Sequence, residues 1–170
     1  LFGVLPQAGL LCVMEALEKE VKLNESSLES LYSLSWEMLS EMHRAGITIG
    51  SHTKTHAILT KESQPKVLEE LTGSRQQLEK RLGVAIQHIA YTDGQFDTKT
   101  LSAVAASGYR FGYTTCHHRN PRYPVLTIPR HILWETSCMD VLGRFSSSMM
   151  NCHVNGVFKL IDRCRDNHGT

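Results

Sequence analysis

Apolar positions recur at helical spacing in three stretches of the chain, and short apolar runs lie between them. In the first stretch, residues 35–45, the apolar side chains fall three residues apart: Trp36, Leu39 and Met42. Ser35 can cap the start of a helix here, and Gly46 can end it. The pattern therefore predicts a helix from about Ser35 to Ala45 that buries one face.

The second stretch predicts a longer helix that starts near Ser63. Pro65 falls in its first turn and Gly83 follows its end. Its apolar stripe consists of Val67, Leu71, Leu78 and Leu82. Charged residues occupy other positions, and we expect them to form a solvated face with no function of its own. These are Glu69, Glu70, Arg75, Lys80 and Arg81.

The third helical stretch runs from about Thr98 to Ser107 and is followed by Gly108. Apolar runs predict strands before and after the helices: Ile47–Gly50, Ile86–Tyr91, Tyr109–Thr114 and a short Val125–Ile128. Strands that alternate with helices are typical of βαβ units. The sequence therefore predicts an α/β fold with a parallel sheet or barrel.

Polar residues follow three of these strands directly: His52, Thr92-Asp93 and Thr114-Thr115. In parallel α/β folds, functional sites form where the carboxyl ends of the strands meet. We therefore expect these residues to lie close together at one edge of the sheet.

The two ends of the chain give weaker patterns. The first 14 residues carry no charge but are interrupted by Pro6 and Gly9. They are too short for a membrane span and lack the basic start of a signal peptide. We expect a core strand and loop here, with the preceding part of the domain missing. Residues 24–33 read as a loop or short helix, and 155–165 as a closing helix.

Composition narrows the class of protein. A chain of 170 residues with 41% hydrophobic and 21% charged residues fits one globular domain over residues 1–170. The net charge is +1 and the basic residues form no stripe, which argues against a nucleic-acid partner. Five cysteines without a CxxC motif predict reduced, mostly buried thiols and a reducing compartment. They are Cys12, Cys116, Cys138, Cys152 and Cys164.

The segment GITIGSHTKTH places two histidines, His52 and His56, four residues apart behind a predicted strand. Zinc binds neutral imidazole, and one local segment can supply two ligands at a low ordering cost. The helical metallopeptidase motif is excluded because Thr53, rather than glutamate, follows the first histidine. Two interpretations stay open from spacing alone: a metal-binding pair, or two surface histidines.

Other chemically interesting residues have simpler interpretations beside the functional ones. Cys116, His117 and His118 can line a pocket or form a polar loop. Cys152, His153, Cys164 and His168 are potential zinc ligands without the usual spacing. Arg130 can steady a barrel or contact a sugar. Trp36 and Trp134 can stack on sugar rings, although Trp36 lies on an apolar helix stripe.

Two quoted segments carry a resemblance to a known family. LSWEMLSEMHRAGITIGSHTKTHAILT, followed by LEELTGSRQQLEKRLGVAIQHIAYTDGQFD, closely resembles the NodB-type polysaccharide deacetylases of carbohydrate esterase family 4. The likeness covers about residues 34–115, and the SHTKTH element is its most specific part. It implies a distorted (β/α) barrel, incomplete at the N-terminus in this chain. It also implies that His52 and His56 bind Zn²⁺ or another divalent metal.

The resemblance implies metal-assisted hydrolysis of N-acetyl groups on a glycan, the expected partner. The metal polarises the carbonyl and lowers the pKa of water towards about 7. By alignment, Tyr91 and Thr92 border the substrate, and the backbone N–H of Asp93 donates to the oxyanion. The strand variant points to a bacterial source. An exported or cell-envelope location follows from the family, whereas the cysteines indicate the cytoplasm.

The chain departs from the family pattern in three places. The paired aspartates that supply a third ligand and the base should precede the histidines, yet no aspartate occurs before Asp93. This predicts a truncated chain that binds metal weakly and turns over poorly. Ala90 and Asp93 stand where arginine and tyrosine are common. The motif of the acid histidine is not evident, which leaves His131 and His153 as candidates.

Two rival functions follow from these departures. A catalytically inactive carbohydrate-binding or regulatory module on the same fold would bind sugar without releasing acetate. A small structural metal domain would use Cys152 and Cys164, and replacing these residues would unfold it when metal is lost.

Overall fold

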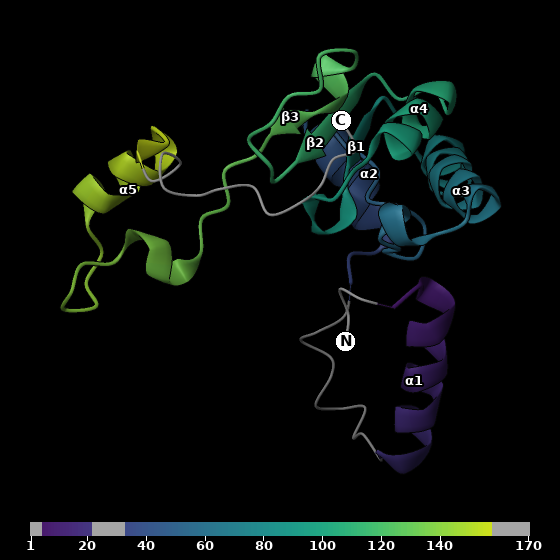
Figure 1. Ribbon diagram of the computed structural model, residues 1–170, viewed down its shortest axis with the longest axis horizontal. Helices are drawn as coiled ribbons and strands as arrows, with labels where there is room; N and C mark the ends of the chain where they lie inside the picture. Colours follow the sequence, from purple (N-terminus) through teal and green to yellow (C-terminus); the bar gives the residue numbers. More distant parts are fainter. Residues whose placement is uncertain (1–4, 22–32, 158–170) are drawn as a thin grey trace.

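The computed structural model describes residues 5–21 and 33–157 of the chain (Figure 1). Within these residues the α-helices are α1 (Gln7–Glu20), α2 (Trp36–Arg44), α3 (Gln64–Leu82), α4 (Thr98–Ala106) and α5 (Ser147–Val154). The strands are β1 (His88–Ala90), β2 (Phe111–Thr114) and β3 (Ile128–Pro129). Short 3₁₀ turns are η2 (Leu59–Lys61), η3 (Thr92–Gly94), η4 (Pro124–Leu126) and η5 (Glu135–Cys138).

The three strands form one parallel sheet in the order β1-β2-β3. On the outer side of β1, Ser51 forms a parallel bridge with Ile89, so its segment continues the sheet by one residue pair. Parallel strands joined by helices confirm the predicted α/β class. A closed barrel is not formed by the residues that the structure describes, which contribute a short, open sheet.

One face of the sheet is buried beneath α3 and α4, which lie together beside it (Figure 1). The core joins Leu71 of α3, Ile89 of β1 and Leu101 of α4, each with no exposed surface. Side chains alternate along a strand, so the neighbouring positions face the other side. His88 and Tyr113 lie there, half-buried, with their rings stacked and His88 Nδ1 2.9 Å from the tyrosine hydroxyl.

The ends of the helices follow the predicted capping residues. The hydroxyl of Ser35 accepts a hydrogen bond from the Met38 N–H at the start of α2. Gly83 ends α3 with φ = 70°, a left-handed conformation that glycine adopts without a steric penalty. Asp97 caps α4 by accepting from the Thr100 N–H at 2.7 Å. The three predicted central helices are therefore confirmed within a residue or two.

The prediction of a core strand and loop over the first 14 residues is wrong from Gln7 onward, because Gln7–Glu20 forms α1; residues 1–4 of that prediction lie outside the described residues. A short apolar run alone does not separate strand from helix. Pro6, which immediately precedes the helix, was the better signal, since proline fits a helix start. Nothing on α1 is buried, and the helix extends from the body (Figure 1).

Two predicted strands are also wrong in extent. Residues 47–50 pair with no strand, and the pairing begins at Ser51. In the second case Pro124 opens the turn η4, and β3 comprises only Ile128–Pro129. Proline fits the first turn of a helix because its φ is preset, which favours the turn η4 over a strand at this position.

The predicted C-terminal helix, residues 155–165, is wrong at its start. The helix α5 ends at Val154, and Asn155 is its C-cap, so the predicted helix 155–165 does not start there. Residues 158–165 of that prediction, and 24–32 of the predicted loop, lie outside the described residues. Among residues 5–21 and 33–157, no helix is both long and apolar enough to span a membrane.

Candidate functional site

The predicted histidine pair lies at the carboxyl end of β1. The imidazole rings of His52 and His56 meet edge to face, with centroids 4.8 Å apart and planes at 78°. His52 Nδ1 lies 2.7 Å from the carbonyl oxygen of Ala90, the last residue of β1. Since a carbonyl only accepts hydrogen bonds, Nδ1 carries the proton and Nε2 keeps its lone pair. The strand therefore holds one imidazole in a form that can ligate a metal.

The surroundings favour the neutral form of His52. Partial burial of the ring lowers the pKa of His52 below its usual range. The hydrogen bond to Ala90 opposes this shift, whereas electrostatic repulsion from His56 and from the Arg130 guanidinium lowers the pKa of His52 further. A lowered pKa means that the ring is uncharged at neutral pH. Neutral imidazole is the form that binds divalent ions.

The backbone around the pair is in an uncommon conformation. Within the described part of the chain, the non-glycine residues with positive φ are Thr53 (66°), His56 (61°) and Asp93 (55°). Positive φ is strained for a β-branched residue such as threonine. Such residues persist only where the surrounding structure holds them, and they cluster at functional sites. All three belong to the predicted site.

The turn η3 brings Asp93 beside the pair. Asp93 is exposed, and its carboxylate accepts a hydrogen bond of 3.0 Å from the Gln95 side chain. Within the turn, the N–H groups of Gly94 and Gln95 donate to the carbonyls of Tyr91 and Thr92. Behind it, the Thr114 hydroxyl donates to the Gly94 carbonyl at 2.6 Å. The end of β2 therefore fixes the turn that presents the Asp93 backbone.

A cleft of about 530 Å³ lies between this turn, the histidine loop and α1. Thr55, His56, Thr92 and Asp93 form its polar wall, and Leu10 and Met14 of α1 its apolar wall. His52 faces a second, neighbouring cleft of about 440 Å³ above the half-buried face of the sheet. The two imidazoles thus line different clefts, His56 the first and His52 the second.

The predicted substrate neighbours Tyr91 and Thr92 are both buried. Tyr91 is 0% exposed, and its hydroxyl donates to the Leu126 carbonyl at 2.8 Å, so its side chain belongs to the core. This burial raises the pKa of Tyr91 far above its usual range. Only the backbone of Tyr91 can therefore face a substrate, whereas Thr92 does line the cleft.

Arg130 follows β3 and reaches over the end of the sheet. Its N–H donates to the Thr114 carbonyl at 2.7 Å, and its guanidinium Nη2 lies 3.4 Å from the Tyr91 carbonyl. Its buried Nε has no hydrogen-bond partner among the described residues, and burial lowers the pKa of Arg130. The positive charge acts on His52, which places this cation at the same end of the sheet.

The two candidate acids lie in a different part of the molecule. His131 Nδ1 is 3.3 Å from the carbonyl oxygen of His153, so its ring is directed towards α5. Figure 1 shows α5 at the end of an extended connection, away from the sheet. The structure therefore does not bring His131 or His153 to the His52–His56 pair.

The remaining predicted clusters are only partly described. Cys116 is buried, and its sulfur lies 3.3 Å from His118 Nδ1. Cys12, Cys116, Cys138 and Cys152 are thiols rather than disulfides, but only Cys116 is buried. Cys164 and His168 lie outside the described residues. Trp36 is half-buried beneath Arg81, whereas Trp134 is 70% exposed.

Two imidazoles fit two of the ligand positions of a divalent ion, and the oriented Nε2 of His52 supports that fit. In residues 5–21 and 33–157, no group of three or more His, Cys, Asp or Glu side chains is placed to hold a metal. Within the described residues the histidine pair therefore offers two ligand positions, not a complete metal site.

One residue at this site was misjudged from the sequence. Glu70 was expected on the solvated face of α3, yet it is 0% exposed and accepts hydrogen bonds from the loop that joins His52 to His56. The signal was present, because Glu70 stands three residues after Val67 and four before Ser74. All three positions lie on the buried face of α3.

Comparison with known proteins defines the class. The chain is similar in fold to the Streptococcus pyogenes deacetylase PplD, solved in complex with acetate. The two are 27% identical with a TM-score of 0.55, over 61% of this chain and 46% of that one. A polysaccharide deacetylase from Bacillus cereus is 35% identical with a TM-score of 0.52, over 58% and 32% of the two chains.

The family model of polysaccharide deacetylases matches residues 12–112, so the chain belongs to the polysaccharide deacetylase family. It is also 29% identical over 89 residues to the Bacillus subtilis (strain 168) protein YxkH, which is provisionally named a polysaccharide deacetylase. That match covers 52% of this chain and 32% of YxkH. The chain thus spans about a third of the curated relative and less than half of the solved ones.

Proposed function

We propose that this chain carries the metal-binding part of a deacetylase that hydrolyses N-acetyl groups on a glycan. The observation that carries the proposal is the His52–His56 pair, held at the end of β1 by the Ala90 carbonyl. The pair lies inside the family match. The proposal extends the domain over residues 1–170 and includes a distorted barrel, which further strands would complete.

In this proposal His52 and His56 hold Zn²⁺ or another divalent ion. A bound ion of this kind polarises the amide carbonyl and makes water a better nucleophile. The contribution of the chain is to supply neutral imidazoles at a set separation. The lowered pKa of His52 and its bond to Ala90 favour the neutral form.

The turn η3 and Arg130 supply electrostatic stabilisation. The backbone N–H of Asp93, held at φ = 55° beside the cleft, is proposed to donate to the developing oxyanion. One oxygen of the Asp93 carboxylate accepts a hydrogen bond from the Gln95 amide, which directs that oxygen towards Gln95. Arg130 adds a positive charge at the same end of the sheet. The general base and a third ligand are proposed to come from outside the described residues.

His131 receives no role as the acid in this proposal, because its ring is directed towards α5. The bacterial source, the location in the envelope or cytoplasm and the identity of the glycan stay predictions. The second candidate function is a carbohydrate-binding module without hydrolysis. It is favoured by the presence of only two grouped metal-ligating side chains in the part of the chain that the structure describes.

Titration of the full chain with Zn²⁺ in a calorimeter tests the metal site. We expect His52→Ala and His56→Ala each to weaken binding at least about a hundredfold, because each removes a ligand. Since neither side chain is part of the buried core, the free energy of unfolding should change by less than about 1 kcal/mol. Unchanged zinc affinity in both variants would overturn the assignment.

His153→Ala is the matched control, because it removes an imidazole on α5. It should leave zinc affinity unchanged, whereas loss of binding would favour the Cys/His structural site. Acetate release from an N-acetylglucosamine oligomer by the longest available form of the protein separates the two functions. Sugar binding without acetate release would favour the binding module.

A further inference from the structure

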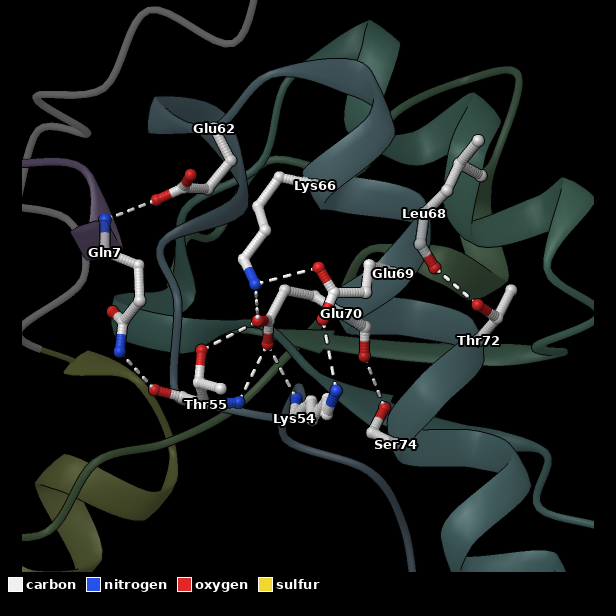
Figure 2. A network of polar contacts seen from close by, with 10 residues as sticks. All are labelled: Gln7, Lys54, Thr55, Glu62, Lys66, Leu68, Glu69, Glu70, Thr72 and Ser74. Carbon is white, nitrogen blue, oxygen red and sulfur yellow. Dashed lines mark hydrogen bonds and ion pairs between the residues drawn. The ribbon is translucent and has the colours of Figure 1, made fainter.

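The carboxylate of Glu70 is the most fully buried charged group in the described chain, with 0% exposure. Burying a carboxylate costs free energy unless it is hydrogen-bonded and paired. Glu70 accepts hydrogen bonds from the N–H groups of Lys54 and Thr55, both at 2.8 Å, and from the Thr55 hydroxyl at 2.7 Å. Lys66 adds an ion pair at 3.2 Å. Figure 2 shows these contacts converging on one side chain.

These contacts reach the middle of the histidine loop. Lys54 and Thr55 are two of the three residues between His52 and His56, and both of their main-chain N–H groups donate to the same oxygen, Oε2. The loop needs such support, because Thr53 and His56 on either side of these two residues have positive φ. The path between the imidazoles is therefore tied to α3 by a charge-assisted contact.

A second contact fixes the start of the same loop. The hydroxyl oxygens of Ser51 and Ser74 are hydrogen-bonded at 2.8 Å, and the Thr53 N–H donates to Ser51 Oγ. Ser74 stands four residues after Glu70, one helical turn along α3. One face of α3 thus holds the loop at two points.

The outer contacts are weaker. Lys66 bridges Glu69 and Glu70, and Lys54 pairs with Glu69 on the surface (Figure 2). Exposed pairs of this kind contribute little. From the other side, the Gln7 side chain donates to the Thr55 carbonyl at 2.8 Å. The buried carboxylate remains the central contact of the network.

We propose that Glu70 is a positioning residue for the His52–His56 pair. Its carboxylate sets the conformation of residues 53–55 and hence the separation and direction of the two imidazoles. The metal-binding consequence rests on the proposed function, whereas the effect on the loop does not. The two can therefore be tested separately on the full chain.

The main variant is Glu70→Gln, which keeps size but turns one acceptor oxygen into an N–H₂ donor that faces other donors. Glu79→Gln is the matched control. Glu79 also lies on α3 and accepts from a main-chain N–H, that of Ile86 at 3.0 Å, and from Arg75. Both variants should lower the melting temperature. Only Glu70→Gln should weaken Zn²⁺ binding, by at least about tenfold, as is usual for residues that support metal ligands.

The second readout uses the metal-free chain. In Glu70→Gln, hydrogen exchange at the Lys54 and Thr55 amides should accelerate at least about tenfold, with shifted ¹⁵N signals from both imidazoles. In Glu79→Gln the change should instead appear at the Ile86 amide. If wild-type chain binds no zinc but Glu70→Gln releases the loop amides, the proposed function fails and the positioning role stands.

Loop amides that stay protected in Glu70→Gln, with an unchanged imidazole spectrum, would overturn the positioning role even if the chain binds zinc. Should Glu70→Gln not fold, Thr55→Val decides the matter, because it removes only the hydroxyl donor to Glu70. We then expect zinc binding weakened about threefold and faster exchange at the Thr55 amide. Wild-type values for both would equally refute the proposal.

Discussion

The central body, residues 36–130, and the C-terminal arm, residues 131–157, differ in what holds their side chains in place. The body has a continuous core in which Leu71 and Ile89 are fully buried. In the arm α5 has no buried residue, and Trp134 and Phe145 are 70% and 69% exposed. A buried core fixes geometry through close packing, whereas an exposed segment without a core depends on individual hydrogen bonds.

The contacts of the candidate site follow this difference. In the body, His52 bonds to Ala90 and Glu70 bonds to Thr55, across 38 and 15 residues. In the arm, Asp140 accepts from the Leu142 and Arg144 N–H groups, only two and four residues away. The body therefore fixes the positions of His52 and His56. His131 and His153 contact each other within the arm.

The sharpest test of this contrast is a pair of core and surface truncations. Leu71→Ala removes a side chain with 0% exposure and should lower the free energy of unfolding by about 2–5 kcal/mol, including the cavity that it leaves. Phe145→Ala in the arm should cost less than about 0.5 kcal/mol. Urea unfolding followed by circular dichroism measures both. Equal losses of unfolding free energy in the two variants would show that Phe145 is packed as tightly as the core residue Leu71.

Two glycines with similar backbone angles give a second test. Gly94 (φ = 69°) and Gly143 (φ = 72°) both adopt left-handed conformations. A Cβ on Gly94 would meet the side chain of Thr115, and the Thr115 nitrogen at 2.7 Å, whereas nothing lies within 4 Å of one on Gly143. Gly94→Ala should therefore cost about 2–4 kcal/mol and Gly143→Ala about 1 kcal/mol. If the two variants had similar midpoints of urea unfolding, the close packing of Gly94 in η3 against Thr115 would be contradicted.

The smallest expected effect is on the pH dependence of stability. Burial opposes ionisation of Glu70, but its hydrogen bonds with Thr55, Lys66 and Lys54 outweigh this and lower the pKa of Glu70. Because its pKa is lowered by folding, the ionised carboxylate stabilises the folded state at pH values above the usual glutamate pKa of about 4.3. This stabilisation is lost as the pH falls below that value and the carboxylate becomes protonated. Melting temperature should fall with acidification in this range.

In Glu70→Gln that acid-dependent fall should be shallower. Asp140→Asn is the control from the arm, where the pKa of Asp140 is also lowered, chiefly by the Arg144 N–H. Because that carboxyl makes only local contacts in an exposed segment, its removal should leave the main transition unaltered. A flatter profile in Asp140→Asn alone would reverse the contrast between body and arm.

Local signals in the sequence sufficed for the three central helices and for placing the histidine pair at the end of a strand. Ser35 and Gly83 mark ends of α2 and α3 because capping depends on a few adjacent residues. The apolar positions after Pro6 misled because the surface that a segment packs against, rather than its composition, decides between strand and helix. Glu70 was missed for a related reason: a carboxylate looks solvated until the donors that it meets, Lys54 and Thr55, are known.

The hydrogen bond from His52 to position 90 has a consequence for mutational robustness. Its acceptor is a main-chain carbonyl, so substitutions of the Ala90 side chain do not remove it. A half-buried position can thus drift in identity while the imidazole keeps its tautomer and direction. Alignments of side chains would register no constraint there, although the backbone carries one. The orientation of the His52 ring therefore depends on the backbone conformation at position 90 and not on which side chain stands there.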